Sequence, residues 1–168
     1  KIASSASPAS NGTATSLTAR IWVSSGSTVC KGIIYSNTAS APDALLATSD
    51  EGTISNATEQ EVTFNFSGAE QISLTSGTTY WIGIFCQDTG TPTLSVSRDN
   101  TASGAIRNAD TYSDGPANPY GAGTTQNGPV DVYVTYTEAS AGTPATHKQT
   151  LPIEYKQIIP SEYKVIIQ

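Results

Sequence analysis

The sequence predicts an all-β protein: an antiparallel β-sandwich, jelly-roll-like in topology, with an extended β tail at the C-terminal end. Three observations predict this class. Short stretches of alternating apolar and polar residues recur along the chain, as expected for strands with one buried face. Gly, Pro, Asn and Ser residues separate these stretches, and no segment has a convincing helical pattern. Apolar residues are 37% of the 168 residues, which is enough for one packed core.

The first strands are expected after a flexible leader, residues 1–16, which is rich in Ser, Ala and Thr. Apolar and polar residues alternate in Leu17–Val23, which predicts a strand. A second strand is predicted at Thr28–Tyr35, and the turn at Ser24–Ser27 would join the two as a hairpin. The following stretch, Asn37–Glu59, is expected to be mainly loop.

Four further strands and a long loop complete the predicted sandwich. Alternation predicts strands at Val62–Phe66, Thr93–Ser97 and Val130–Tyr136. The strongest strand pattern is Thr79–Cys86, where both faces are apolar, so we expect it to lie at the centre of a sheet. The Gly- and Asn-rich stretch Ala102–Gly128 is expected to be a long loop.

These elements divide the chain into a leader, a sandwich domain at 17–137, a linker of small residues at 138–146 and a tail at 147–168. The tail repeats itself, since Glu154–Ile159 recurs as Glu162–Ile167. Its large apolar side chains are costly to leave in water, at about 1.5–3 kcal/mol each. The tail should therefore join a sheet, either by folding back on its own domain or by completing the sheet of a neighbouring copy. The side chains expected to mediate assembly are Leu151, Ile153, Tyr155, Ile158, Ile159, Tyr163, Val165 and Ile167.

Two cysteines, Cys30 and Cys86, lie in apolar strand-like stretches. A single disulfide is the first interpretation, and two buried thiols are the alternative. No zinc site is expected, because there is no CxxC pair and no nearby His.

Composition also bears on location and partners. The net charge is −6 and the basic residues are scattered, which argues against nucleic acid as a partner. No apolar stretch approaches the roughly 20 residues needed to span a bilayer. The chain contains no Met, so we expect Lys1 to have been exposed by cleavage during export and the protein to be extracellular or at the cell surface.

Catalysis is not expected, and neither is a cofactor. The one histidine, His147, stands at the start of the tail, outside the predicted core. Carboxylates are spread over loops, and no nucleophile, metalloprotease, phosphate-binding or dinucleotide-binding motif occurs.

The long loop carries the weaker candidate ligand residues. Asp110, Asp114 and Asn118 supply oxygens that calcium could use, although turns favour the same residue types. Tyr112 and Tyr120 could stack on sugar rings or could instead cover the edge of the sandwich.

Three sequons, at Asn11, Asn56 and Asn65, are possible glycosylation sites, and about two such triplets are expected by chance in so Ser- and Thr-rich a chain. In a strand, Asn65 would lie on the face opposite Phe64 and Phe66, where a glycan would reach solvent.

Several stretches resemble jelly-roll-like accessory domains of microbial surface and phage proteins, a resemblance that covers roughly residues 17–137. They are Val62–Phe66, Leu74–Ile84, Ala109–Gly121 and Val132–Tyr136. The resemblance implies an architecture more than an activity, because that family includes presumed adhesive and carbohydrate-contacting modules. The tail is similar in mechanism to the donor strand of pilus subunits, although the usual donor is N-terminal.

We therefore expect an extracellular filament subunit joined to other copies of itself by strand addition of the tail. The alternative is a monomeric module that binds carbohydrate or a receptor through the Tyr112–Tyr120 loop, in which case the partners would be glycans or cell surfaces.

Overall fold

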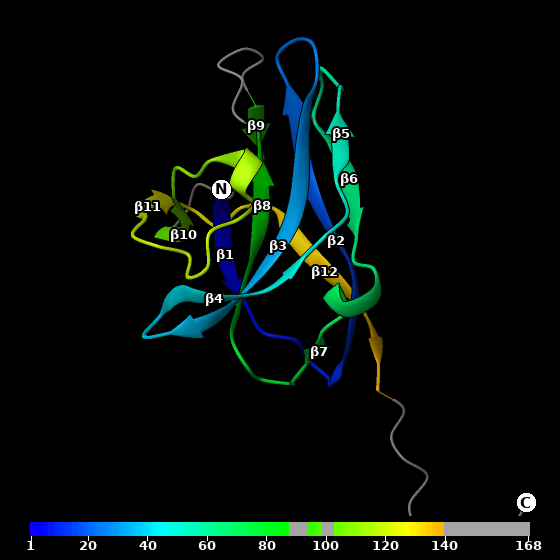
Figure 1. Ribbon diagram of the computed structural model, residues 1–168, viewed down its shortest axis with the longest axis vertical. Coiled ribbons are helices and arrows are strands. Elements are labelled where there is room, and N and C mark those ends of the chain that lie inside the picture. The colour runs from blue at the N-terminus through cyan, green and yellow to red at the C-terminus, as the bar shows by residue number, and fades with distance from the viewer. Residues whose placement is uncertain (88–93, 99–102, 140–168) are drawn as a thin grey trace, which may run out of the picture.

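The computed structural model describes residues 1–87, 94–98 and 103–139, and these form an antiparallel β-sandwich (Figure 1). The predicted all-β fold class is confirmed. The tail 147–168, with His147, and residues 140–146 of the linker lie outside the described residues. The strands are β1 (Ile2–Ala6), β2 (Gly12–Val23), β3 (Thr28–Thr38), β4 (Ala41–Thr48), β5 (Gly52–Ile54), β6 (Gln60–Asn65), β7 (Ser73–Leu74), β8 (Tyr80–Cys86), β9 (Leu94–Val96), β10 (Ser103–Arg107), β11 (Thr124–Asn127) and β12 (Val132–Glu138).

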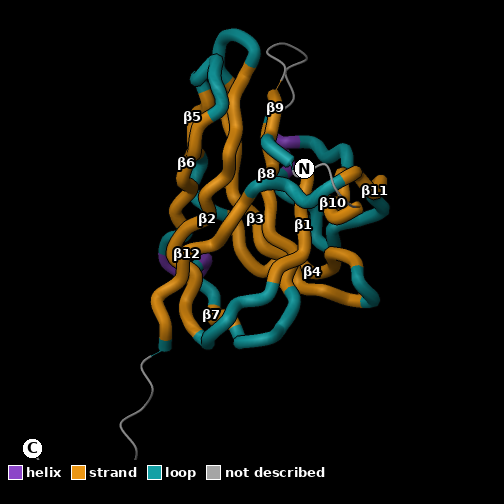
Figure 2. The backbone as a smooth tube through the Cα atoms, turned by 180° about the vertical axis from the view of Figure 1, so that it is seen from behind, coloured by secondary structure: helices purple, strands orange, loops and turns teal. Residues whose placement is uncertain are grey.

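The strands form two sheets of unequal width. The wide sheet has the order β11-β10-β1-β8-β3-β4, with β5 also paired to β3. The narrow sheet has the order β12-β2-β6, with β7 and β9 paired to the two ends of β2. Both views show the chain leaving β12 at the end of the molecule where β7 lies (Figures 1 and 2).

The main core fills the space between the sheets. Alternate residues of β2, from Leu17 to Val23, are fully buried there against Ile34, Phe64 and Ile84. The sheets approach closely at Gly32, where a Cβ would lie 3.0 Å from Leu17 Cβ. Alternation in the sequence thus identified the inward side chains correctly.

A second core covers the outer face of the wide sheet. Trp81 and Phe85 of β8 lie on this face, and they pack with Ile33, Tyr35 and Tyr120. Tyr80, Ile82 and Ile84 of the same strand belong to the main core. The prediction that both faces of this strand are buried at the centre of a sheet is therefore confirmed.

The predicted flexible leader is wrong. Residues Ile2–Ala6 form β1, which lies between β8 and β10 (Figure 1, dark blue beside green). Their small side chains suit this crowded place: Ala3 is fully buried, and a Cβ at Gly83 would lie 2.8 Å from Ala3 Cβ. Ser4 is buried as well, and its Oγ accepts a hydrogen bond from the Val130 N–H. This stretch is a strand because it pairs with β8 and β10. Its residues are small because these neighbours leave little room for larger side chains.

Three other expectations also need correction. β2 and β3 do not form a hairpin, because the turn between them carries the chain from the narrow sheet to the wide one. The predicted loop Asn37–Glu59 contains β4 and β5, and the predicted loop Ala102–Gly128 contains β10 and β11. These four strands lack the strong alternation that marks half-buried strands.

The burial of β1 makes a direct prediction. Ala3→Asp should lower the free energy of unfolding by about 3 kcal/mol or more, because it buries an unpaired carboxylate. Ala9→Asp is the matched control, since Ala9 is exposed and should tolerate the charge. Urea denaturation of both variants measures the difference, and equal stabilities would mean that β1 is not part of the folded sheet.

Candidate functional site

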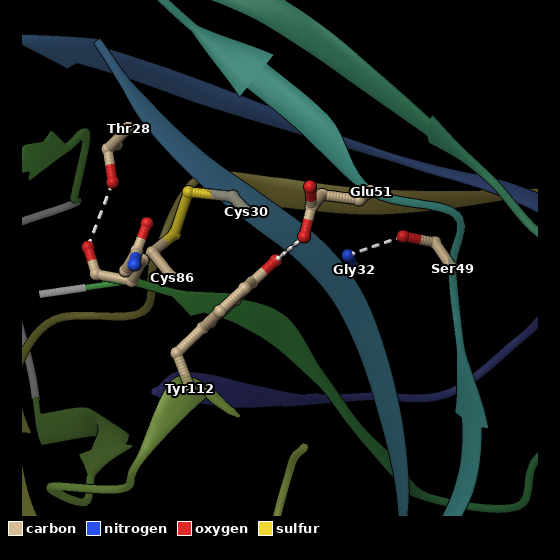
Figure 3. Close-up of a disulfide and its surroundings, with 8 residues drawn as sticks. Thr28, Cys30, Gly32, Ser49, Glu51, Cys86 and Tyr112 are labelled. Carbon is tan, nitrogen blue, oxygen red and sulfur yellow. Dashed lines mark hydrogen bonds between the residues drawn. A yellow bond between two sulfur atoms is a disulfide. The ribbon is translucent and has the colours of Figure 1, made fainter. Parts of the chain in front are cut away.

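Cys30 and Cys86 form the predicted disulfide (Figure 3). The two residues are directly opposite each other in the β3–β8 pair, and Cys30 is fully buried. Beside them, the Thr28 hydroxyl donates to the Gln87 carbonyl oxygen at 2.9 Å. The cross-link therefore joins the two central strands of the wide sheet near one end.

Loss of the disulfide should destabilise the fold. The sequence separation of 56 residues corresponds to about 4 kcal/mol in the chain-entropy model. A Cys30→Ala/Cys86→Ala variant should show a loss of that order in urea denaturation. A reductant should lower the free energy of unfolding of the wild type and leave that of the variant unchanged. If the reductant had no effect on the wild type, the cysteines would not be linked in solution.

Tyr120 is unavailable to a ligand, which contradicts its predicted stacking role. Its side chain is 0% exposed, and its ring lies edge-on to Tyr35 with centroids 4.9 Å apart. Its hydroxyl donates to the Ile106 carbonyl oxygen at 2.7 Å, and burial raises its pKa. Tyr120 therefore covers the sandwich and does not stack on a sugar ring.

Tyr112 is half-buried and holds the same loop from its other end. Its ring stacks on Phe85 at 4.8 Å, and its hydroxyl donates to Glu51 Oε2 at 2.8 Å (Figure 3). Burial and the Glu51 carboxylate raise the pKa of the Tyr112 hydroxyl. Both tyrosines therefore fasten the loop to the outer face of the wide sheet.

Asp110 is the electrostatic anchor of this loop. Lys1 Nζ lies 2.6 Å from Asp110 Oδ2 and 4.6 Å from the centroid of the Tyr120 ring. The same carboxylate accepts hydrogen bonds from the Ala117 and Thr111 N–H groups. Burial alone would raise the pKa of Asp110, but these hydrogen bonds and the Lys1 charge hold it below its usual value.

The three calcium candidates have different partners. Asp110 binds Lys1, Asp114 accepts from the Ser113 hydroxyl, and Asn118 Oδ1 accepts from the Leu45 N–H. In the part of the chain that the structure describes, no three His, Cys, Asp or Glu residues are grouped so that they could hold a metal ion.

The lowered pKa of Asp110 predicts a step in acid stability. Since its folded pKa lies below the unfolded value of about 3.9, its contribution is present above pH 4 and is lost as the pH falls through the folded pKa. Asp110→Asn should be less stable than the wild type near pH 6, and the gap should narrow towards pH 2. Asp114→Asn, at an exposed site, is the control. Urea midpoints across this range measure the effect, and a gap that stayed constant would contradict it.

The predicted glycosylation sites differ in accessibility. Asn11 and Asn65 are exposed, and Asn65 faces away from the buried Phe64 and Phe66, as predicted. Asn56 is half-buried, and its Nδ2 donates to the Ile21 and Thr58 carbonyl oxygens. A glycan at Asn56 would have to break one of these bonds.

Two clefts remain as candidate sites, and the first lies beside β12. This edge cleft has a volume of about 250 Å³ and is mostly apolar. It is bounded by β12, by β8 and by the connection from β1 to β2. Its lining residues are Ala6, Ser7, Pro8, Ala9, Ile34, Leu74, Tyr80, Ile82, Val132, Tyr133, Val134 and Tyr136.

The second cleft lies towards the other end of β8, where β9 faces β1 and β10. This mouth cleft has a volume of about 570 Å³. No sequence motif indicated it, because its residues come from separate strands. They are Lys1, Ile2, Ile84, Cys86, Gln87, Leu94, Ser95, Val96, Arg98, Arg107, Asn108, Ala109, Asp110 and Gln126.

Comparison with known proteins adds no assignment. No family model, curated protein or solved structure matches this chain. Among the described residues, no helix is long and apolar enough to cross a membrane.

Proposed function

We propose that this protein is an extracellular structural protein whose copies assemble into filaments by strand addition. In this proposal the apolar tail of one copy pairs with β12 of the next and fills its edge cleft. The observation that carries the proposal is the open edge of β12 beside an apolar cleft. The disulfide supports an oxidising, extracellular setting.

The edge of β12 is suited to strand addition. Within the described residues β12 pairs with β2 alone, so its other side presents backbone N–H and C=O groups to a partner. An added strand would extend the narrow sheet over the part of the wide sheet that it does not cover. Main-chain hydrogen bonds would supply affinity and the cleft would select the side chains.

The edge cleft offers apolar surface to the incoming strand. Val134 and Tyr136 of β12 are only partly buried, and Ile82 and Leu74 complete the lining. Ile, Val and Tyr side chains of the tail match this chemistry, and each one buried contributes about 1.5–3 kcal/mol. The conformational entropy lost when the tail is held in the cleft is thus offset by the burial of its apolar side chains.

Linker length and the repeat favour a neighbouring copy over fold-back. Antiparallel strands that pair within one chain need a loop of only 2–5 residues, whereas nine residues separate the predicted sandwich from the tail. Nine extended residues reach about 30 Å, far enough to meet a second molecule. The tail also contains two strand-like halves, whereas a tail that folded back on its own β12 would need only one strand. A head-to-tail contact that does not close produces a filament.

The proposal is tested by removing the tail. The full chain should form polymers that grow with concentration in sedimentation velocity and appear as filaments by electron microscopy. A chain ending at Thr146 should be monomeric and should still unfold cooperatively, at a lower melting temperature than the polymer, because its cleft is no longer filled by a tail. A full chain that stays monomeric at all concentrations would refute the proposal, as would a truncated chain that polymerises.

Two negative charges introduced into the tail give a sharper version of this test. Ile153→Asp/Val165→Asp should abolish polymers, because the charges cannot enter an apolar cleft. Gln149→Asp/Gln168→Asp carries the same added charge at polar tail positions and should still polymerise. Adding the peptide 147–168 to the truncated chain should slow hydrogen exchange at the β12 amides, and exchange unchanged there would place the tail elsewhere.

A further inference from the structure

Two arginines occupy inward-facing positions on opposite sheets at the mouth cleft. On the wide sheet, Arg107 pairs with Ile2, and Ile2 pairs with Ile84. Residues directly opposite each other on neighbouring strands share a face, and Ile84 lies in the core between the sheets. The Arg107 side chain therefore projects from the inner face of the wide sheet, towards the narrow sheet.

Arg98 reaches the same cleft from the narrow sheet. Leu94 and Val96 pair with Val23 and Ile21 of β2, which are fully buried in the main core. Arg98 is the next residue in this alternation, so it continues the inner face. Both arginines are among the residues that line the mouth cleft.

The cleft carries an excess of positive charge in an acidic protein. Among the described residues that line it, the cationic side chains are Lys1, Arg98 and Arg107 and the carboxylate is Asp110, which gives an excess of two positive charges in this part of the lining. Asp110 is held by Lys1 at 2.6 Å. No ion pair between described residues involves Arg98 or Arg107. Both arginines are exposed at the rim of the sandwich, on the inner side of their sheets, and their guanidinium groups can bind an incoming anion.

The rest of the lining indicates what kind of anion fits. Ile2, Ile84, Leu94 and Val96 form an apolar surface that can cover one face of a ligand. Gln87, Asn108 and Gln126 also line the cleft, and side-chain amides both donate and accept, which suits hydroxyl groups. The Asn108 Nδ2 already donates to the Tyr120 carbonyl oxygen at 2.7 Å, which leaves its Oδ1 as an acceptor. The volume of about 570 Å³ lies within the range of small-molecule sites.

We infer that the mouth cleft binds a sugar carboxylate, a hexuronate either free or within an acidic polysaccharide. The carboxylate would bind Arg98 and Arg107, the ring would rest on the apolar surface, and its hydroxyls would bind the amides. Arg suits this role because its planar guanidinium can bind both carboxylate oxygens. The mouth and edge clefts lie towards opposite ends of β8, so this site does not depend on assembly through the tail.

Isothermal titration calorimetry with galacturonate and tetragalacturonate tests the inference, using the chain ending at Thr146 alongside the full chain. At least one uronate should bind both chains, and neutral galactose and its oligomers should not. Equal affinity for monomer and tetramer would identify a free sugar acid as the ligand, and binding of the tetramer alone would identify a polysaccharide. No binding of either uronate at millimolar concentration would overturn the inference, as would equal binding of the neutral sugars or binding of an acidic peptide only.

Arginine variants locate the site. Arg98→Gln and Arg107→Gln should each weaken uronate binding about tenfold or more, the loss expected for one charge-assisted hydrogen bond. Arg20→Gln removes the same charge from an exposed arginine that pairs with Glu59 and Asp131, and should bind as the wild type does. In the wild type, NMR shifts on uronate addition should centre on Ile2 and Val96. Shifts centred elsewhere, or an equal loss with Arg20→Gln, would refute the assignment.

Discussion

The rest of the structure depends on the burial of β8 on both faces. Its alternate side chains enter two different cores, so the wide sheet needs a cover on each side. The narrow sheet covers one face. On the other face the cover is the loop around Tyr112 and Tyr120, which is therefore as much a part of the core as a strand is. The disulfide joins β8 to β3, the neighbouring strand that shares both cores.

This double burial takes up polar groups of the covering loop that a ligand would otherwise meet. A Gly-, Asp- and Tyr-rich loop is the usual place for a ligand, since loops carry function on rigid scaffolds. Here the loop's polar groups are used internally: Asp110 binds Lys1, and the Tyr35 hydroxyl donates to the Ala117 carbonyl oxygen. Groups that are not used in this way include the backbone edge of β12 and the side chains at the mouth between the sheets.

The sequence predicted the features that one strand can reveal alone. Alternation identified the two faces of β8 and the exposed side of Asn65, and two cysteines in strong strands predicted their own pairing. Sequence-based prediction failed where neighbouring strands determine which residues fit at a position. β1 is Ser- and Ala-rich because Gly83 lies against Ala3, and that fit is invisible without the pairing. The same holds for Arg98 and Arg107, whose convergence requires the register of five strands.

The unequal width of the sheets connects the two clefts. The wide sheet continues past β8 through β1, β10 and β11, whereas the narrow sheet ends at β12 on one side and reaches β9 only at one end of β2. Inner surface of the wide sheet is therefore left without a facing strand at both ends of β8. At one end the neighbouring groups are apolar with an open backbone edge, which suits a strand. At the other end they include guanidinium and amide groups, which suit a hydroxylated anion. One mismatch in strand number thus produces two clefts of different chemistry.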